Sequence, residues 1–307
     1  MMKLGIIANP EVASLDYAKD LGLDFVEFDV NCATGSPWDD PSSPRCSGHA
    51  LLKLADDFKA GIKRTGVQVG AVGRWASRII DGDGKIIDSE FEQVKALIDF
   101  IKQVGAGAYL VSVNYISELS YYKNITAAIN YLNKVCEYAG DLPVCIVNCA
   151  TGTNYIRTPN EWRLVLTEVP KLRIKYDPSH SFVHGGVNGA YMEEAFEFGD
   201  RFGYVHIKGV VQGSKQSEPT AMKYFKWMRE FPDLAKYIRP ELEENGKYYD
   251  NPPAGLDAIN WRAFMAILYK HGYDGMLSIE PHSRTWQGDL GERGVKFTID
   301  YMRGLMI

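Results

Sequence analysis

Three short apolar runs each end in side chains that bind metal ions or transfer protons. The first run ends at Asp177 and is followed by His180. The second ends at His206, and the third ends at Glu280. In parallel α/β proteins such strand ends meet at one face, where these folds build their sites. Two carboxylates and an imidazole suit a divalent ion such as Mn²⁺, Zn²⁺, Mg²⁺ or Co²⁺. We therefore predict a metal site at Asp177, His206 and Glu280.

Each of these residues also has a simpler interpretation. Asp177 and Pro178 are a common strand stop, and a single apolar-flanked histidine such as His206 is usually a hydrogen-bonded core residue. Their coincidence at three strand ends favours the site, because metal centres are built from such convergences. His180 is then either a fourth ligand or a donor to a substrate oxygen.

A lysine follows the second ligand at strand spacing. Lys208 is two residues after His206, so strand alternation points both side chains the same way. A lysine inside a barrel mouth is costly unless paired, so we expect Lys208 to meet an acid or a substrate oxygen; a solvated lysine beyond the strand end is the alternative. We predict Glu280 as ligand and base, with Lys208 or His180 stabilising a developing oxyanion.

Further polar side chains are candidates for substrate binding. Glu27 lies in an early apolar run, and we expect it to bind a substrate hydroxyl or to pair with Lys208 or Arg74. His282 and Arg284 follow the third run. The planar guanidinium of Arg284 suits a carboxylate or phosphate, and a solvated loop arginine is the alternative.

Strand-like and helix-like segments alternate along the chain. Eight apolar runs begin near residues 3, 24, 67, 107, 143, 172, 203 and 275. Helical spacing of apolar residues covers 11–22, 50–64, 89–104, 122–138, 189–201, 261–270 and 294–306, and Thr158 with Glu161 marks a further helix start. Eight such units predict an α/β fold, a single (β/α)8 TIM-barrel domain over residues 1–307. An open doubly wound sheet is the alternative, although no GxGxxG motif follows the first strand.

One long polar stretch interrupts this alternation. Residues 212–258 separate the seventh and eighth strands, and we expect them to form an insertion over the site. Local helix is expected over 220–229, because a structureless loop of that length is uncommon.

Composition excludes several classes of partner. The 307 residues are 46% apolar and 24% charged, with a net charge of −5 and a pI of about 5.7. No basic face is visible, so nucleic acid is not expected as a partner. No apolar run approaches the ~20 residues that span a bilayer, so no membrane is expected. Five cysteines without a CxxC pair suggest a reducing, cytoplasmic location.

The chain resembles a known superfamily in four stretches. It is similar to the xylose-isomerase-like TIM barrels, which comprise sugar isomerases, epimerases and relatives of endonuclease IV. The stretches are 25–28, 176–180, 205–208 and 272–280. The resemblance implies the same (β/α)8 barrel and a small-molecule carbohydrate as substrate, and leaves assembly into a homo-oligomer open.

The resemblance also implies a ligand set. The family holds its metal with a glutamate at the end of strand five and with Asp, His and Glu on later strands, which correspond to Asp177, His206 and Glu280. At strand five this chain has Asn148 and Cys149 where the family has glutamate followed by asparagine. An amide can coordinate a metal but is no general base. We therefore expect Asn148 to face the ion and weaken its binding, and Asn148→Glu to tighten it by on the order of tenfold.

These observations predict a metal-dependent isomerase or epimerase. Its substrate would be a sugar, inosose or related polyol, and the reaction a proton transfer next to a carbonyl. Because the family glutamate is missing, a one-base isomerisation is favoured over two-base epimerisation. Two alternatives stay open: a non-catalytic sugar-binding barrel or subunit, and a lyase or dehydratase on the same site. A trinuclear zinc site like that of endonuclease IV is not expected, because residues 67–114 contain no histidine.

Overall fold

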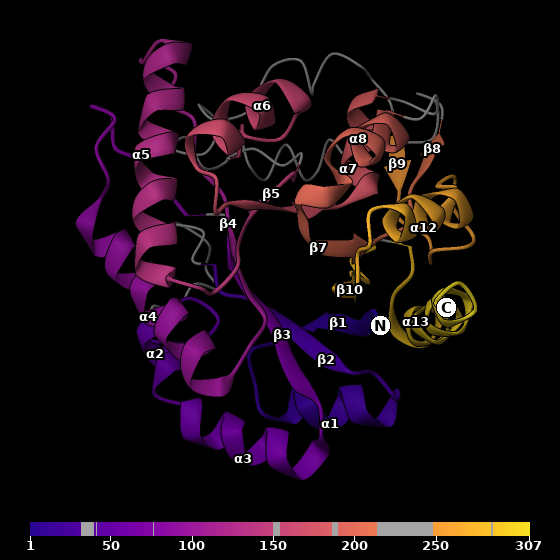
Figure 1. Cartoon of the computed structure of the whole chain (residues 1–307). Coiled ribbons are helices and arrows are strands. Elements are labelled where there is room, and N and C mark those ends of the chain that lie inside the picture. The colour runs from indigo at the N-terminus through magenta and orange to yellow at the C-terminus, as the bar shows by residue number, and fades with distance from the viewer. Residues whose placement is uncertain are drawn as a thin grey trace.

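Eight parallel strands close into a barrel in the order β1-β10-β7-β6-β5-β4-β3-β2 (Figure 1). The structure is a computed structural model that describes residues 1–31, 40, 42–75, 77–149, 154–185, 190–213, 248–283 and 285–307. The strands are β1 (Lys3–Ala8), β2 (Phe25–Asp29), β3 (Gln68–Arg74), β4 (Ala108–Val111), β5 (Val144–Val147), β6 (Arg173–Tyr176), β7 (Phe202–Ile207) and β10 (Met276–Ile279). Each begins within one residue of its predicted start, and the predicted (β/α)8 fold is confirmed.

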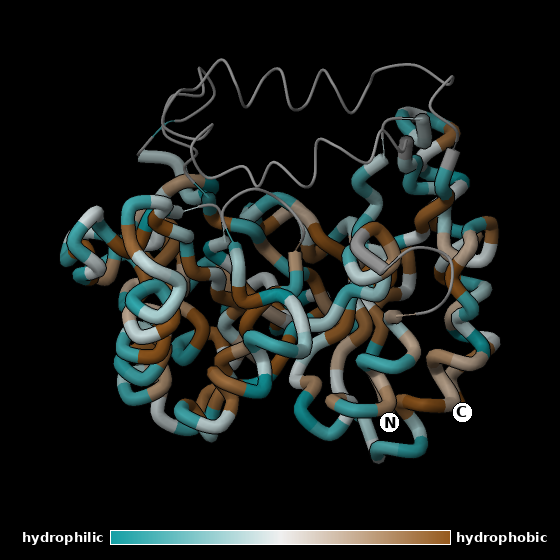
Figure 2. The backbone as a smooth tube through the Cα atoms, turned by 90° about the horizontal axis from the view of Figure 1, so that it is seen from above, coloured by the Kyte–Doolittle hydropathy of each residue, from teal (hydrophilic) through white to brown (hydrophobic). Residues whose placement is uncertain are grey.

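Helices form a ring outside the strands (Figure 1). They are α1 (Ala13–Asp20), α2 (Gly48–Leu52), α3 (Ala55–Thr65), α4 (Asp88–Val104), α5 (Tyr121–Ala139), α6 (Pro159–Glu168), α7 (Pro178–Gly185), α8 (Ala190–Phe198), the 3-10 turn η1 (Gly199–Arg201), α12 (Trp261–Lys270) and α13 (Gly288–Arg303). The longer helices bury an apolar stripe: α4, for example, buries Val94, Leu97 and Ile101, which lie on one face of a helix. The chain ends lie close together on one side of the molecule (Figures 1 and 2).

Three helices differ from the sequence prediction. The segment expected as one helix over 50–64 is two helices, because Ser47 caps α2 by accepting a hydrogen bond from the Ala50 N–H, and α3 starts separately. A Cβ at Gly48 would come within 2.5 Å of the Gln93 carbonyl oxygen, so glycine permits the close packing of α2 on α4. The last helix begins at residue 288, earlier than the predicted 294. Helix α7 was not predicted.

A small ribbon leaves the barrel after β7. Strands β8 (Val211–Gly213) and β9 (Tyr248–Asp250) pair antiparallel, at the two ends of the predicted insertion. Residues 214–247, which include the helix predicted over 220–229, lie outside the described residues. Within the described part, no helix combines the length and apolar character needed to cross a membrane.

Inward-facing side chains fill the barrel interior on the amino-terminal side of the polar residues. Phe25 packs with Leu110, Val147 and Tyr204 in a separate apolar cluster inside the strands. A Cβ on Gly5 would lie 2.3 Å from the Phe25 ring, so this glycine gives the ring its space. The cluster forms the floor beneath the polar residues at the carboxyl ends.

Candidate metal centre and active-site cavity

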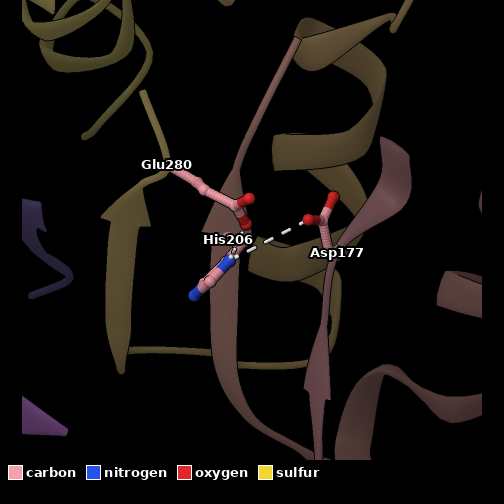
Figure 3. A group of neighbouring side chains, drawn as sticks. All are labelled: Asp177, His206 and Glu280. Atoms are coloured by element: carbon pink, nitrogen blue, oxygen red, sulfur yellow. Dashed lines mark hydrogen bonds and ion pairs between the residues drawn. The ribbon is translucent and has the colours of Figure 1, made fainter. Parts of the chain in front are cut away.

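The three predicted ligands converge at neighbouring strands (Figure 3). Asp177 directly follows β6, His206 lies near the end of β7, and Glu280 directly follows β10. One ligand atom from each lies within 4.8 Å of the others. The His206 Nδ1 atom is 2.9 Å from Glu280 Oε2 and 3.9 Å from Asp177 Oδ2. The structure therefore brings these three residues together, as the sequence predicts.

The carboxylate of Asp177 divides its two oxygens between two tasks. Oδ1 accepts a hydrogen bond of 2.8 Å from the Ser179 N–H, so Asp177 caps α7, with Pro178 at the first helical position. Oδ2 is buried and has no hydrogen-bond partner among the described residues. His180 Nε2 lies 3.5 Å from it. A buried carboxylate oxygen without a donor is costly unless it meets a cation, so the donor set fits a divalent ion.

His206 is held from behind by Glu27. Its Nε2 atom lies 2.9 Å from both carboxylate oxygens of Glu27, which is only 1% exposed. This bond turns Nδ1 toward Asp177 and Glu280, the arrangement in which metal-binding histidines donate their other N–H to a carboxylate. Burial lowers the pKa of His206, but Glu27 outweighs it and raises the pKa to about 9.

Two expected partners of Glu27 are corrected by this geometry. Glu27 was expected to bind a substrate hydroxyl or to pair with Lys208 or Arg74. Arg74 instead forms a bidentate ion pair with Glu90 at 2.9 Å, and Lys208 pairs with Glu280. Strand β2 lies beyond β1 and β10 from β7 in the barrel order, so this contact crosses the barrel and sequence spacing gives no sign of it.

Glu280 is the most heavily bonded carboxylate of the site. Oε2 meets His206, while Oε1 accepts hydrogen bonds from Lys208 and from His282 Nδ1, the latter at 3.1 Å. Burial raises the pKa of Glu280, but the Lys208 ammonium and the two histidines bring it well below its usual range. Such a carboxylate is a good ligand and a weak base.

The remaining predicted residues are placed as follows. His180 and His282 both line the cavity, and the His282 side chain is 58% exposed. Arg284 lies outside the described residues. Asn148 is 1% exposed and does not line the cavity.

The structure places Asn148 away from the predicted ion. Its amide oxygen accepts a hydrogen bond from the Asp177 N–H, and its amide nitrogen donates to the Asp177 carbonyl and to Ser181 Oγ. Strand alternation turns Val147 and Cys149 inward, and both line the cavity. The expectation that Asn148 coordinates the metal or binds substrate is therefore corrected: it braces the end of β6, and Cys149 has the inward position.

A cavity of about 430 Å³ opens over this cluster, a usual size for a small-molecule site. Its described lining includes two residues that were not predicted as site residues, Asp29 and Lys175. It also includes Trp75, a residue that the sequence offers as an apolar wall for a sugar ring. Burial and the charge of Glu27 raise the pKa of Asp29 to about 6. The alternation that puts Glu27 and Asp29 on one face of β2 was visible in the sequence, and it is the signal for Asp29.

Comparison with known proteins agrees with this architecture. D-allulose 3-epimerase from Methylomonas sp. is similar at 16% identity, with 99% of this chain and 98% of that chain covered and a TM-score of 0.66. 3-keto-D-glucoside 4-epimerase from E. coli matches at 16% identity over 99% and 100% of the two chains, with a TM-score of 0.65. The probable 3-DHS dehydratase AsbF from Bacillus anthracis matches at 13% identity over 98% and 99%, also with a TM-score of 0.65. No curated protein matches the sequence.

At these identities the structural likenesses show the fold alone. The family is given by the sequence itself, because the model of one family matches residues 15–305, nearly the whole chain. The chain belongs to the xylose isomerase-like TIM-barrel family.

Proposed function

We propose that the protein is a metal-dependent isomerase or epimerase acting on a sugar, inosose or related polyol. One observation carries this proposal: Asp177 Oδ2 is a buried carboxylate oxygen that accepts no hydrogen bond from any described residue and lies beside His206 and Glu280. These residues stand at a cavity of ligand size. The similar structures of D-allulose 3-epimerase and 3-keto-D-glucoside 4-epimerase support the substrate class.

Asp177, His206 and Glu280 would hold the ion. A divalent metal bound there supplies a Lewis acid that polarises a substrate carbonyl or hydroxyl. Glu27 holds the His206 ring in the orientation that presents Nδ1. Lys208, fixed by Glu280, presents an ammonium to oxygen charge that develops on the substrate.

Proton transfer is best assigned to Asp29. The sequence analysis gave the base role to Glu280, but the pKa of that carboxyl lies well below its usual range, because Lys208 and the histidines offset its burial. Asp29 stands on β2, opposite β6 in the barrel order, and lines the same cavity. With a pKa of about 6, it is ionised at neutral pH and basic enough to take a proton from a carbon next to a carbonyl. One carboxylate at this position supports a one-base isomerisation.

The test is hydrogen exchange into substrate from D₂O. Mn²⁺-loaded protein is incubated with the ketoses D-fructose, D-allulose, D-tagatose and L-sorbose and with the keto acids 2-keto-D-gluconate and 5-keto-D-gluconate. Deuterium at the carbon next to the carbonyl is followed by NMR. We expect exchange with at least one of these compounds, lost on chelation. Asp29→Asn should lower the exchange rate by about 100-fold or more, the usual contribution of a general base. Asp24→Asn, at the opposite end of β2, is the matched control and should retain the rate.

Two outcomes would contradict the proposal. Binding of ketoses and keto acids without exchange in any of them would favour a non-catalytic sugar-binding barrel. Formation of a dehydrated product would favour a dehydratase, a second candidate suggested by the similar structure of the probable 3-DHS dehydratase AsbF.

A further inference from the structure

Lys175 is a buried lysine at the base of the cavity. It lies on β6 two residues before Asp177, so both side chains point into the barrel. It is 4% exposed and lines the cavity. Its register partners on the neighbouring strands are Val147 and Tyr204, which belong to the apolar floor. The backbone of Lys175 thus lies one strand layer below Asp177, and its side chain enters the cavity from that layer.

This amine has no hydrogen bond or ion pair with any described residue, unlike the other charged groups around it. Glu27 pairs with His206, and Lys208 pairs with Glu280. Burial raises the pKa of Glu27 and Asp177, and the charge of Lys175 is among the influences that bring both pKa values below the usual range. These carboxylates therefore lie near Lys175 without being bonded to it.

An unpaired ammonium in such a place has an energetic cost. A methionine or leucine would fill similar volume among apolar neighbours without desolvating a charge. No described side chain bonds to this charge, so an oxygen on a molecule in the cavity would give it a partner. Because Lys175 enters the cavity from the strand layer below Asp177, that oxygen belongs to the part of the ligand that reaches toward the barrel floor.

We propose that Lys175 binds a carboxylate of the substrate, so that the substrates are keto-sugar acids rather than neutral sugars. This inference rests on the proposed function, because it assumes that the ligand's carbonyl lies at the cluster. A carboxylate carries one charge, which matches one unpaired ammonium. A phosphate carries nearly two and needs more donors, whereas Val147 and Tyr204, the described residues level with Lys175 on the neighbouring strands, carry no charge.

Matched ligands that differ in one group test this proposal. 2-Keto-D-gluconate and D-fructose differ only at C1, a carboxylate against a hydroxymethyl, and 5-keto-D-gluconate and L-sorbose differ in the same way at the far end from the ketone. Their affinities for Mn²⁺-loaded protein are measured by calorimetry. We expect the acid of at least one pair to bind about tenfold or more tightly than its neutral partner, the range of a charged hydrogen bond.

Two lysine variants test whether the preference for keto acids comes from Lys175. Lys175→Met should abolish the preference by lowering the affinity for the keto acid. The affinity for the neutral ketose should change by less than about twofold. Lys171→Met makes the same substitution at an exposed position before β6 and should keep the preference. Circular dichroism and Mn²⁺ affinity check folding, and Lys175→Gln replaces the methionine variant if that variant does not fold.

Three results would overturn the proposal: no preference in either pair, a preference that survives in Lys175→Met, or equal losses for acid and ketose. Borohydride reduction that attaches the ligand covalently to Lys175 would also overturn it, in favour of an imine. Hydrogen exchange is scored separately, so a protein that prefers keto acids but exchanges no hydrogen contradicts the proposed reaction and leaves this inference standing.

Discussion

At the scale of single residues, Glu27 decides how His206 is presented. Glu27→Gln keeps the volume but replaces the carboxylate that accepts from Nε2 with a neutral amide. We expect the affinity for Mn²⁺ to fall by about 10- to 100-fold, the usual effect of losing such a partner. Calorimetric titration of chelator-stripped protein measures it, with Asp24→Asn as control. Unchanged affinity in Glu27→Gln would mean that His206 binds no metal through Nδ1.

Positions 148 and 149 give opposite predictions for the same substitution. Cys149 lines the cavity, so Cys149→Glu adds a third carboxylate near the cluster and should tighten Mn²⁺ binding by about tenfold. Asn148→Glu should not tighten it, since Asn148 points into bonds with Asp177 and Ser181. It should lower the Tm instead, because a buried carboxylate cannot donate as the amide does. Tighter Mn²⁺ binding in Asn148→Glu would contradict this placement and would mean that residue 148 faces the ion, as the resemblance to the family implies.

At the scale of elements, the cap of α7 joins folding to metal binding. Asp177→Asn keeps a capping oxygen for the Ser179 N–H but removes the charge, whereas Asp177→Ala removes both. Both variants should lose Mn²⁺ binding. Relative to the asparagine variant, the alanine variant should be less stable by about 1 kcal/mol, which for a chain of this length lowers the Tm by about 1–2 °C. Thermal unfolding in chelator compares the two, and equal Tm values would contradict the capping role.

The elements were largely predictable because their signals are local. Apolar runs give the eight strand starts, and helix spacing gives most of the outer ring. Helix α7 was missed because Asp177, Pro178 and His180 were interpreted as a ligand loop, although Asp followed by Pro is also a helix start. The rest depends on barrel closure. The contact of Glu27 with His206 and the pairing of Lys208 with Glu280 join residues 179 and 72 positions apart, which no local pattern contains.

At the scale of the whole molecule, the stability of the metal-free protein should depend on pH through His206. Its pKa is about 9, above the ordinary value of 6.5, because Glu27 offsets the effect of burial. A histidine with a raised folded pKa stabilises fully below its unfolded pKa and loses that contribution as the pH rises through the folded pKa. Urea unfolding in chelator should therefore show a falling unfolding free energy from pH 6.5 to 9.

The Mn²⁺-loaded protein provides the contrast. Metal binding requires the unprotonated Nδ1 atom, so affinity should rise over the same pH interval with release of a proton. The loaded protein should then keep or gain stability where the metal-free protein loses it. A metal-free protein whose stability is constant or rises from pH 6.5 to 9 would contradict the assigned pKa of His206.

The most direct test of the account is anomalous diffraction from crystals grown with Mn²⁺. The account predicts one strong Mn²⁺ peak coordinated by Asp177 Oδ2, His206 Nδ1 and a Glu280 oxygen, with Glu27 still bonded to His206 Nε2. Loss of that peak in Asp177→Asn crystals would tie it to the carboxylate. A peak elsewhere, or none at saturating Mn²⁺ with the three side chains arranged as they are here, would contradict the metal centre.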